Sequence, residues 1–303
     1  MTSIPECKVF IRGAGEQASG VGHRLARCGF HVCMAEVARP LAVRREVAFC
    51  EAVLDGTKTV EGIEGILAHS VADVTETWRR RRIAVVVDPE CSLCAELRPH
   101  VVVDAILAKR NIGTHMKLAP LVIGLGPGFT AGMDVHAVVE TNRGHDLGRV
   151  ILSGSAEPDT GVPGSIGGYS IERVLRSPCA GHLKAVRHIG DAVAAGEVIC
   201  TVNGNIVNTT ISGVLRGLLR DDLVVPAGFK LGDVDPRAAR EACFTISDKA
   251  RAIGGGVLEA ILMHLYGIRS VGAPQPAGME AGKPQAAPTR GGVTGASPSR
   301  TAS

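Results

Sequence analysis

Short apolar runs alternate with amphipathic segments along the first 123 residues of the chain. Strands are predicted at residues 7–12, 30–35, 63–68, 83–88, 101–104 and 121–123, and helices at 21–28, 41–54 and 70–81, with a further helix opening after Pro89. Strands that alternate with helices are typical of a parallel sheet covered by helices on its faces. We therefore predict an α/β fold that begins with a Rossmann-like domain over residues 1–123.

The pattern changes after residue 123. Residues 124–173 are rich in glycine and lack helical periodicity, which indicates a linking segment. Residues 174–235 alternate short strands with turns, which favours a small all-β domain of the sandwich or barrel type. Helical segments return at 236–270, where the apolar second helix is expected to pack on the larger domain. Residues 271–303 consist mainly of Pro, Gly, Ala and Ser, and we predict a disordered tail there.

Composition narrows the class of protein. The 303 residues are 45% hydrophobic but only 3% aromatic, so the core must be aliphatic, as in buried parallel strands. A formal charge of +3 with few aromatic residues argues against a nucleic-acid partner. No apolar run approaches ~18 residues and no signal-like leader is present, which argues against a membrane association. The nine scattered cysteines are expected to be reduced, and we predict a cytoplasmic protein.

The first predicted strand leads directly into a glycine fingerprint. The turn reads Gly13-Ala-Gly15-Glu-Gln-Ala18-Ser-Gly20, and Glu36 ends the next strand about twenty residues later. In dinucleotide-binding folds such glycines approach the phosphates, and the acid binds a ribose hydroxyl. The alternative is that Gly13 and Gly15 only permit a tight turn. The strand ends would bring Gly13, Glu36, Asp88, Asp104 and Lys109 to one rim of the sheet.

A second glycine-rich stretch runs from Gly124 to Asp134 and continues from Glu140 to Gly148. Glycines at such density can expose backbone N–H groups to an anion. The predicted cofactor-binding residues here and just upstream are Gly124, Gly126, Gly128, Lys109, Asn111, Asn142 and Arg143. Glu140, His145 and Asp146 are candidates for proton transfer or metal contact. The alternative is that these polar side chains only tie off loops between two domains.

Two further features are ambiguous. Arg44 and Arg45 could reach an anion at the sheet edge, although two arginines on a helix more often form a solvated face. Cys91-x-x-Cys94 at a helix start could be a redox pair, although chance spacing among nine cysteines is the better explanation. Because no second cysteine pair accompanies it, no zinc site is predicted.

Two resemblances extend this interpretation. Residues 174–235 resemble a biotinyl/lipoyl-type barrel-sandwich hybrid through Ser177-Pro178-x-x-Gly181, Gly190-Asp191-x-Val193-x-x-Gly196 and Val225-x-x-Gly228. The hairpin at 201–206 has no lysine, so the resemblance implies the fold without biotin or lipoate. Residues 7–268 resemble the YqeB family through Ile11–Gly15, Arg39–Arg45, Val60–Gly62, Asp104–Asn111, Gly124–Phe129, Glu140–Gly148, Thr160–Gly164 and Gly255–Glu259.

The second resemblance implies an accessory factor for maturation of a selenium-dependent molybdenum hydroxylase. It implies the molybdenum cofactor as ligand, in its pterin phosphate or dinucleotide form, and the hydroxylase or other maturation proteins as partners. Gly13, Gly15, Gly126 and Gly128 would then offer N–H groups, Lys109 and Arg143 would neutralise phosphate, and Asn111 and Asn142 would pair with pterin edges. Two alternatives stay open: an NAD(P)-dependent oxidoreductase with a hydride acceptor near His145, and a non-catalytic assembly adaptor.

Overall fold

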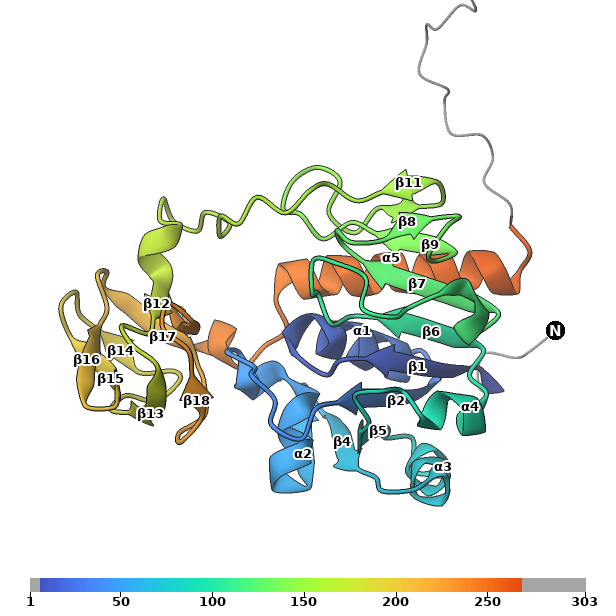
Figure 1. The fold of residues 1–303 in the computed structure, drawn as a ribbon, viewed down its shortest axis with the longest axis horizontal. Coiled ribbons are helices and arrows are strands. Elements are labelled where there is room, and N and C mark those ends of the chain that lie inside the picture. The colour runs from blue at the N-terminus through green and yellow to red at the C-terminus, as the bar shows by residue number, and fades with distance from the viewer. Residues whose placement is uncertain (1–5, 269–303) are drawn as a thin grey trace, which may run out of the picture. The chain divides into compact units, whose positions relative to one another are not determined.

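A nine-stranded mixed sheet organises residues 8–151 in the computed structural model, which describes residues 6–268 (Figure 1). The strand order is β10-β9-β7-β6-β1-β2-β5-β4-β3. The strands are β1 (Lys8–Arg12), β2 (His31–Glu36), β3 (Thr57–Val60), β4 (Ile63–Leu67), β5 (Ile83–Val87), β6 (Val101–Asp104), β7 (Leu121–Leu125), β9 (Ala137–Val139) and β10 (Val150–Ile151). All neighbours from β9 to β4 are parallel, and only the edge strands β10 and β3 run antiparallel.

Helices cover both faces of this sheet (Figure 1). The long helices α1 (Glu16–Arg27) and α5 (Asp248–Leu265) pack together on one face, whereas α3 (Val71–Arg79) and α4 (Leu93–Leu97) lie on the other. Side chains alternate between the faces of a strand. Val9 and Ile11 therefore join the core under α1 and α5, while Phe10 joins the core under α3 and α4. The predicted mixed α/β class and the docking of the last helix on the larger domain are confirmed.

The contact between α1 and α5 depends on glycines. A Cβ added to Gly20 of α1 would lie 2.7 Å from the Cβ of Ala250 and 3.0 Å from its carbonyl oxygen on α5. Gly256 of α5 likewise approaches the carbonyl oxygen of Gly148 closely. These glycines let two helix backbones and a loop lie closer than any larger residue would allow.

The helix predicted over 41–54 is wrong. The segment forms 3-10 turns at Arg45–Val47 and Phe49–Glu51, and only α2 (Ala52–Asp55) is α-helical. The reason is that the backbone N–H of Phe49 donates to Ser19 Oγ and that of Cys50 donates to the Ala14 carbonyl, so these groups serve the fingerprint loop instead of a helix.

Smaller differences concern element boundaries. Helix α1 begins at Glu16, five residues earlier than predicted, so Ala18 and Gly20 are inside it. The predicted helix at 237–243 is a 3-10 turn at Arg240–Cys243. The hairpin strand β3 was not predicted, because its alternating Thr57-Lys-Thr-Val60 sequence has only one buried residue.

Residues 174–235, here called the β module, form two four-stranded antiparallel sheets around one hydrophobic core. The first contains β12 (Val174–Arg176), β19 (Lys230–Asp235), β17 (Gly213–Leu218) and β14 (Ala192–Val193). The second contains β16 (Asn205–Asn208), β15 (Val198–Val202), β13 (Gly181–Ala185) and β18 (Val224–Val225). In the preceding segment, β8 (Thr130–Ala131) pairs with β11 (Gly154–Ser155).

Two further expectations concern the C-terminal tail and membrane association. The disordered tail predicted at 271–303 lies outside the described residues. Within residues 6–268, no helix combines the length and apolarity needed to cross a bilayer.

Candidate functional site

The chain order reverses between β1 and β6. From β1 the sheet continues outward through β2 and β5, and from β6 it continues through β7 and β9. Ligands of open parallel sheets bind in the crevice at the carboxyl ends of the strands at such a switch point. A cavity of about 860 Å³ lies there, lined by the loops that follow both strands, including Gly13, Gly15 and Ala105. Its size is within the range of small-molecule sites.

The loop after β1 presents the start of a helix to this cavity. Gly13 has φ +97 and its N–H donates to the Ala35 carbonyl, so the chain turns sharply there. Gly15 is the N-cap of α1 and supplies no side chain to the free N–H groups of the first turn. Because a helix N-terminus carries partial positive charge, this end of the cavity suits an anion.

Glu36 closes the same loop from the end of β2. Its Oε2 accepts a hydrogen bond of 2.9 Å from the N–H of Ala14, and its Oε1 accepts one of 2.8 Å from Val37. The Glu36 side chain also lines the cavity. Its position is therefore compatible with two roles, which are bracing of the glycine loop and contact with a ligand hydroxyl.

The cavity wall carries many charged side chains of both signs. The basic ones are Arg12, Arg44, Arg143, Arg173, Arg216, Lys230 and Lys249, and the acidic ones are Glu16, Glu36, Asp88, Glu90 and Asp233. Four of these arginines are less than 10% exposed, namely Arg12, Arg44, Arg173 and Arg216. Buried arginines are rare without partners, so their gathering around one cavity identifies the strongest candidate site among residues 6–268.

Arg12 ends β1 and is held at the cavity by β6. Its Nη1 donates to Asp104 Oδ2 at 3.1 Å and also to the hydroxyl of Thr114. Asn111 shapes the turn that presents Thr114, because its Oδ1 accepts the N–H of that residue at 2.8 Å. Asn111 therefore supports Arg12 and does not itself line the cavity.

Arg44 is buried where the sheet region meets the segment that follows the β module. It donates to Glu16 Oε1 at 2.9 Å and to the carbonyl oxygens of Ala242 and Thr245 at 2.7 and 3.1 Å. Burial lowers the pKa of the Arg44 guanidinium. The solvated-face interpretation is thus wrong for Arg44, while Arg45 donates to the Leu218 carbonyl of the β module.

Arg143 and Lys249 bring charge from the linking segment and α5. Arg143 forms a bidentate pair with Asp248 at 2.7 and 2.9 Å, and this hydrogen bonding raises its pKa while lowering that of Asp248. The amine of Lys249, one residue further on, has no hydrogen bond or ion pair within the described part of the chain. Burial, together with the nearby charges of Lys109 and Arg143, lowers the pKa of Lys249.

The structure brings only some of the predicted cofactor-binding residues to the cavity. Gly13, Gly15, Glu36 and Arg143 line it, whereas Ala18, Gly20, Lys109, Asn111, Gly124, Gly126, Gly128 and Asn142 do not. Lys109 forms an ion pair of 3.0 Å with Asp159, and the Asn142 amide bonds the carboxylate of Glu157.

The glycines of the 124–128 stretch are covered by other parts of the chain. A Cβ on Gly124 would lie 2.5 Å from the ring of Phe129, and one on Gly128 would lie 2.7 Å from the backbone of Arg110. The Thr141 side chain covers Gly126 in the same way. These glycines allow protein segments to pack closely and are not among the residues that line the cavity.

The three candidates for proton transfer have different surroundings. Glu140 is buried, and its carboxylate accepts backbone N–H groups from Thr141, Asn142 and Glu157, each at 2.7 Å. Asp146 pairs with Arg149 at 2.7 Å, and His145 is exposed. None of the three lines the cavity. The contacts of Glu140 and Asp146 fit loop-fastening roles.

Cys91 lines the cavity, while Cys94 is buried behind it. Burial raises the pKa of Cys91, and it raises the pKa of Cys94 to about 12. This is the opposite of the lowered pKa that activates a redox thiol. In the part of the chain that the structure describes, no group of three or more His, Cys, Asp or Glu side chains is placed to hold a metal ion.

The sequence analysis did not identify Arg12, Arg173, Arg216 or Lys249. Arg12 and Arg216 did carry a signal, because each is a single charge within an otherwise apolar strand run, Val9-Phe-Ile-Arg12 and Val214-Leu-Arg-Gly-Leu218. Arg173 and Lys249 lie in ordinary polar surroundings. Only the fold brings these two residues to the cavity.

Comparison with known sequences identifies a homologue. The chain is 53% identical over 258 residues to "Uncharacterized protein YqeB" of Escherichia coli (strain K12), which covers 85% of this chain and 48% of that protein. The chain therefore spans about half the length of the relative that it matches. No model of a known protein family matches the chain. The identity supports the resemblance to the YqeB family.

Solved structures give weaker likenesses. An aspartoacylase family protein from Mesorhizobium loti matches 75% of this chain and 84% of its own at 11% identity, with a TM-score of 0.24. TcdA (CsdL) matches 87% and 89% at 15% identity, with a TM-score of 0.30. The ectoine utilization protein EutE (DoeB) from Ruegeria pomeroyi matches 75% and 84% at 12% identity, with a TM-score of 0.23. At these TM-scores the likenesses support no conclusion about this chain.

Proposed function

We propose that this homologue of YqeB binds a phosphate-bearing molybdenum cofactor in the cavity at the β1/β6 switch point. On this proposal the cofactor is cargo, held during maturation of a selenium-dependent molybdenum hydroxylase. The observation that carries the proposal is the coincidence in one cavity of the Gly13–Gly15 loop, the uncapped start of α1 and seven basic side chains.

The proposal includes a finer description of the fold. The nine-stranded sheet would be a Rossmann-like domain, and the β module a barrel-sandwich hybrid that carries no swinging arm. The hairpin between β15 and β16 supports the second point, since residues 201–206 contain no lysine to carry biotin or lipoate.

The residues present fit an anionic cargo. The Nε atoms of Arg12, Arg44, Arg173 and Arg216 are buried and have no hydrogen-bond partner within residues 6–268. A buried donor without a partner is destabilising, and a phosphate offers several acceptor oxygens to such groups. The N–H groups of the first turn of α1 would orient one phosphate, while Arg143 and Lys249 would neutralise charge beside it.

A second candidate function is an NAD(P)-dependent oxidoreductase. Glu36 favours it, because this acid ends β2 and lines the cavity beside the glycine loop, where dinucleotide folds bind a ribose hydroxyl. This alternative lacks assigned catalytic residues, because neither Glu140 nor His145 lines the cavity. The third possibility, an adaptor whose cavity binds no cofactor, is an outcome of the test.

The test is calorimetric titration of the purified chain with molybdopterin, its cytosine dinucleotide form, NAD+, NADH and ATP. Arg143→Ala provides the site variant, since it removes a cavity guanidinium. Arg149→Ala is the matched control, because Arg149 pairs with Asp146 outside the cavity.

The proposal predicts saturable binding of a molybdopterin species that is weakened in Arg143→Ala and retained in Arg149→Ala. Binding of NAD+ or NADH alone would favour the oxidoreductase. If no ligand binds while the chain still captures the hydroxylase, the adaptor function would replace the proposal.

A further inference from the structure

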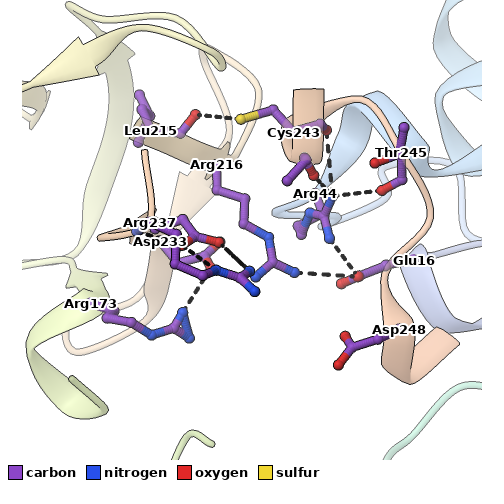
Figure 2. A network of polar contacts seen from close by, with 12 residues as sticks. Glu16, Arg44, Arg173, Leu215, Arg216, Asp233, Arg237, Cys243, Thr245 and Asp248 are labelled. Atoms are coloured by element: carbon purple, nitrogen blue, oxygen red, sulfur yellow. Dashed lines mark hydrogen bonds and ion pairs between the residues drawn. The ribbon is translucent and has the colours of Figure 1, made fainter. Parts of the chain in front are cut away.

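Two buried guanidiniums of the β-module side line the cavity opposite the glycine loop. Arg173 is 6% exposed and precedes β12, and Arg216 is 7% exposed and lies on β17. Figure 2 shows the Arg216 side chain extending from the β module toward Glu16 at the start of α1. The proposed function gives the phosphate at the glycine loop to the first turn of α1 with Arg143 and Lys249 beside it, and assigns no separate ligand group to these two arginines.

The acids nearest Arg216 are already engaged by other arginines. Arg216 lies 3.5 Å from Asp235 and 3.9 Å from Glu16. Asp235, however, accepts hydrogen bonds of 2.7 and 3.0 Å from Arg237, and Glu16 accepts one of 2.9 Å from Arg44. Within residues 6–268, the guanidinium of Arg216 makes ion pairs at these longer distances but no hydrogen bond. A buried guanidinium with five N–H donors and no close acceptor is unusual.

Arg173 is in a similar position. Its contact within the described residues is an Nη1 hydrogen bond of 3.4 Å to Asp233 Oδ2. The Nε of Arg173 and the Oδ1 of Asp233 are buried and have no partner there. Burial lowers the pKa of the Arg173 guanidinium, and the nearby positive charge of Arg216 acts in the same direction, against the opposing effect of Asp233.

The backbone fixes the direction of Arg216. The pairing of β17 with β19 shifts register between Leu215 and Gly217, so Arg216 is the extra residue of a bulge. Bulges re-aim side chains and are frequent beside functional sites. Gly217 also allows the strand to approach Val43, because a Cβ there would lie 2.8 Å from Val43 Cγ1. This close contact holds Arg216 at the cavity.

Positive charge exceeds negative charge at this end of the cavity. The guanidiniums of Arg44, Arg143, Arg173, Arg216 and Arg237 face the carboxylates of Glu16, Asp233, Asp235 and Asp248, five positive charges against four negative ones. Lys230, which also lines the cavity, adds a further positive charge. An oxyanion with several acceptors would balance the charge and use the unfilled donors.

We infer that Arg173 and Arg216 form a second phosphate subsite, at the β-module end of the cavity. The inference rests on the proposed function and names the class of ligand within it: a ligand with two phosphate groups. The first phosphate binds at the start of α1, and the second binds the two guanidiniums. The cavity thus selects a diphosphate-bearing ligand, such as a dinucleotide, over a monophosphate.

The test compares diphosphates with monophosphates. Inorganic pyrophosphate, inorganic phosphate, CDP and CMP are titrated calorimetrically into the wild type, Arg173→Met and Arg216→Met. We expect the wild type to bind the diphosphate probes more tightly than the monophosphates. Each substitution should lower the affinity for the diphosphates by about tenfold or more, which is the effect of losing a charged hydrogen bond. The affinity for the monophosphates should fall much less. Arg216→Lys, which keeps the charge but loses the planar fork, should recover part of the preference.

Arg220→Met is the matched control. Arg220 also joins the β module to the sheet region, through hydrogen bonds of 2.6 and 2.9 Å to Asp55, but it does not line the cavity. Arg220→Met should leave the affinities for the diphosphates and for the monophosphates unchanged. Equal weakening in Arg216→Met and Arg220→Met, or an unchanged diphosphate preference in Arg173→Met and Arg216→Met, would overturn the subsite.

Gly15→Asp separates this subsite from the proposed function. A Cβ at Gly15 would meet nothing within 4 Å, so the fold accepts a side chain there. The added carboxylate should repel any phosphate at the start of α1. If Gly15→Asp abolishes binding while the arginine variants keep the preference, only the subsite fails. If the wild type binds none of the phosphate probes, both the subsite and the proposed function fail.

Discussion

Glu16 Oε1 lies 2.9 Å from Arg44 and 3.9 Å from Arg216, so one carboxylate at the start of α1 faces guanidiniums from the sheet region and from the β module. Glu16 is also a cavity-lining residue. It therefore has two effects that oppose each other. It compensates the buried charge of Arg44, and it places negative charge where we propose that a phosphate binds.

The Glu16→Gln variant should separate these effects. The free energy of unfolding should fall by about 3 kcal/mol, because Arg44 would keep a buried charge without its carboxylate partner. The affinity for pyrophosphate should nevertheless rise, because a negative charge has left the cavity. Denaturant unfolding and calorimetric titration measure the two effects.

Glu76→Gln is the control for this prediction. Glu76 of α3 pairs with Arg80, the residue after the helix, and both side chains are exposed; such surface pairs contribute about 0–1 kcal/mol. Glu76→Gln should change neither the free energy of unfolding nor the affinity for pyrophosphate appreciably. A fall in pyrophosphate affinity in Glu16→Gln would contradict the proposed position of the phosphate.

Two adjacent glycines of α5 should respond in opposite ways to alanine. Gly256→Ala places a Cβ far inside contact distance of the Gly148 carbonyl oxygen and 2.9 Å from Val139 Cγ1. The free energy of unfolding should fall by about 1–3 kcal/mol, as in overpacked cores. Gly255→Ala meets only Arg24 Nη1, at 3.9 Å, and should raise stability by about 0.5–1 kcal/mol. Equal effects in urea denaturation would contradict the described packing of α5.

His23 should make the protein less stable in acid. It is 3% exposed on α1, and burial lowers its pKa below the usual 6.5, against smaller opposing effects of Glu61. Between the lowered folded pKa and 6.5, the unfolded chain binds more protons, so stability decreases as the pH falls through that window. The neighbouring charges of Arg27 and Arg251 act in the same direction.

His23→Gln should therefore show a shallower loss of stability from pH 6.5 to 5, measured by urea denaturation. His31, His100 and His136, whose pKa values burial also lowers, would continue to contribute the same sign. His188→Gln is the control, because the His188 side chain is 83% exposed. An unchanged slope in His23→Gln would contradict the burial of an uncharged imidazole.

Lys249 should make phosphate binding weaker at alkaline pH. Burial and nearby positive charge lower its pKa below 10.5 in the free chain, and a phosphate beside it would raise that pKa again. The ligand then binds better to the protonated amine, so affinity falls as the pH rises through the free-chain pKa.

The measurement is pyrophosphate titration between pH 7.5 and 10. Lys249→Met should bind more weakly at the lower pH and lose this pH dependence. Lys184→Met, which removes an amine paired with Asp221 outside the cavity, should behave as the wild type. The same pH dependence in all three proteins would exclude Lys249 from the site.

The sequence predicted those parts of the fold that depend on local pattern. The apolar runs located β1, β2, β5, β6 and β7, because strands buried on both faces are nearly continuous in Val and Ile. The helix prediction for residues 41–54 failed because the backbone N–H groups of Phe49 and Cys50 form long-range hydrogen bonds to the glycine loop instead of helical ones. Local periodicity carries no information about such partners.

The candidate site was predicted only in part. Gly13, Gly15 and Glu36 follow from a motif of fixed spacing, and all three line the cavity. Gly20 fits the same motif, yet it serves the crossing of α1 and α5. Arg173 and Arg216 reach the cavity through the docking of the β module, which joins residues more than 150 positions from the glycine loop. Sequence spacing cannot encode that contact.

The most direct measurement is the calorimetric affinity of molybdopterin cytosine dinucleotide for the wild type, Gly15→Asp and Gly15→Asn. Both substitutions add an N-cap side chain to α1 and should preserve or raise thermal stability, but only aspartate adds a charge at the cavity. The account predicts saturable binding by the wild type that is retained in Gly15→Asn and lost in Gly15→Asp. Equal affinity in Gly15→Asp and Gly15→Asn, or no binding by the wild type, would contradict it.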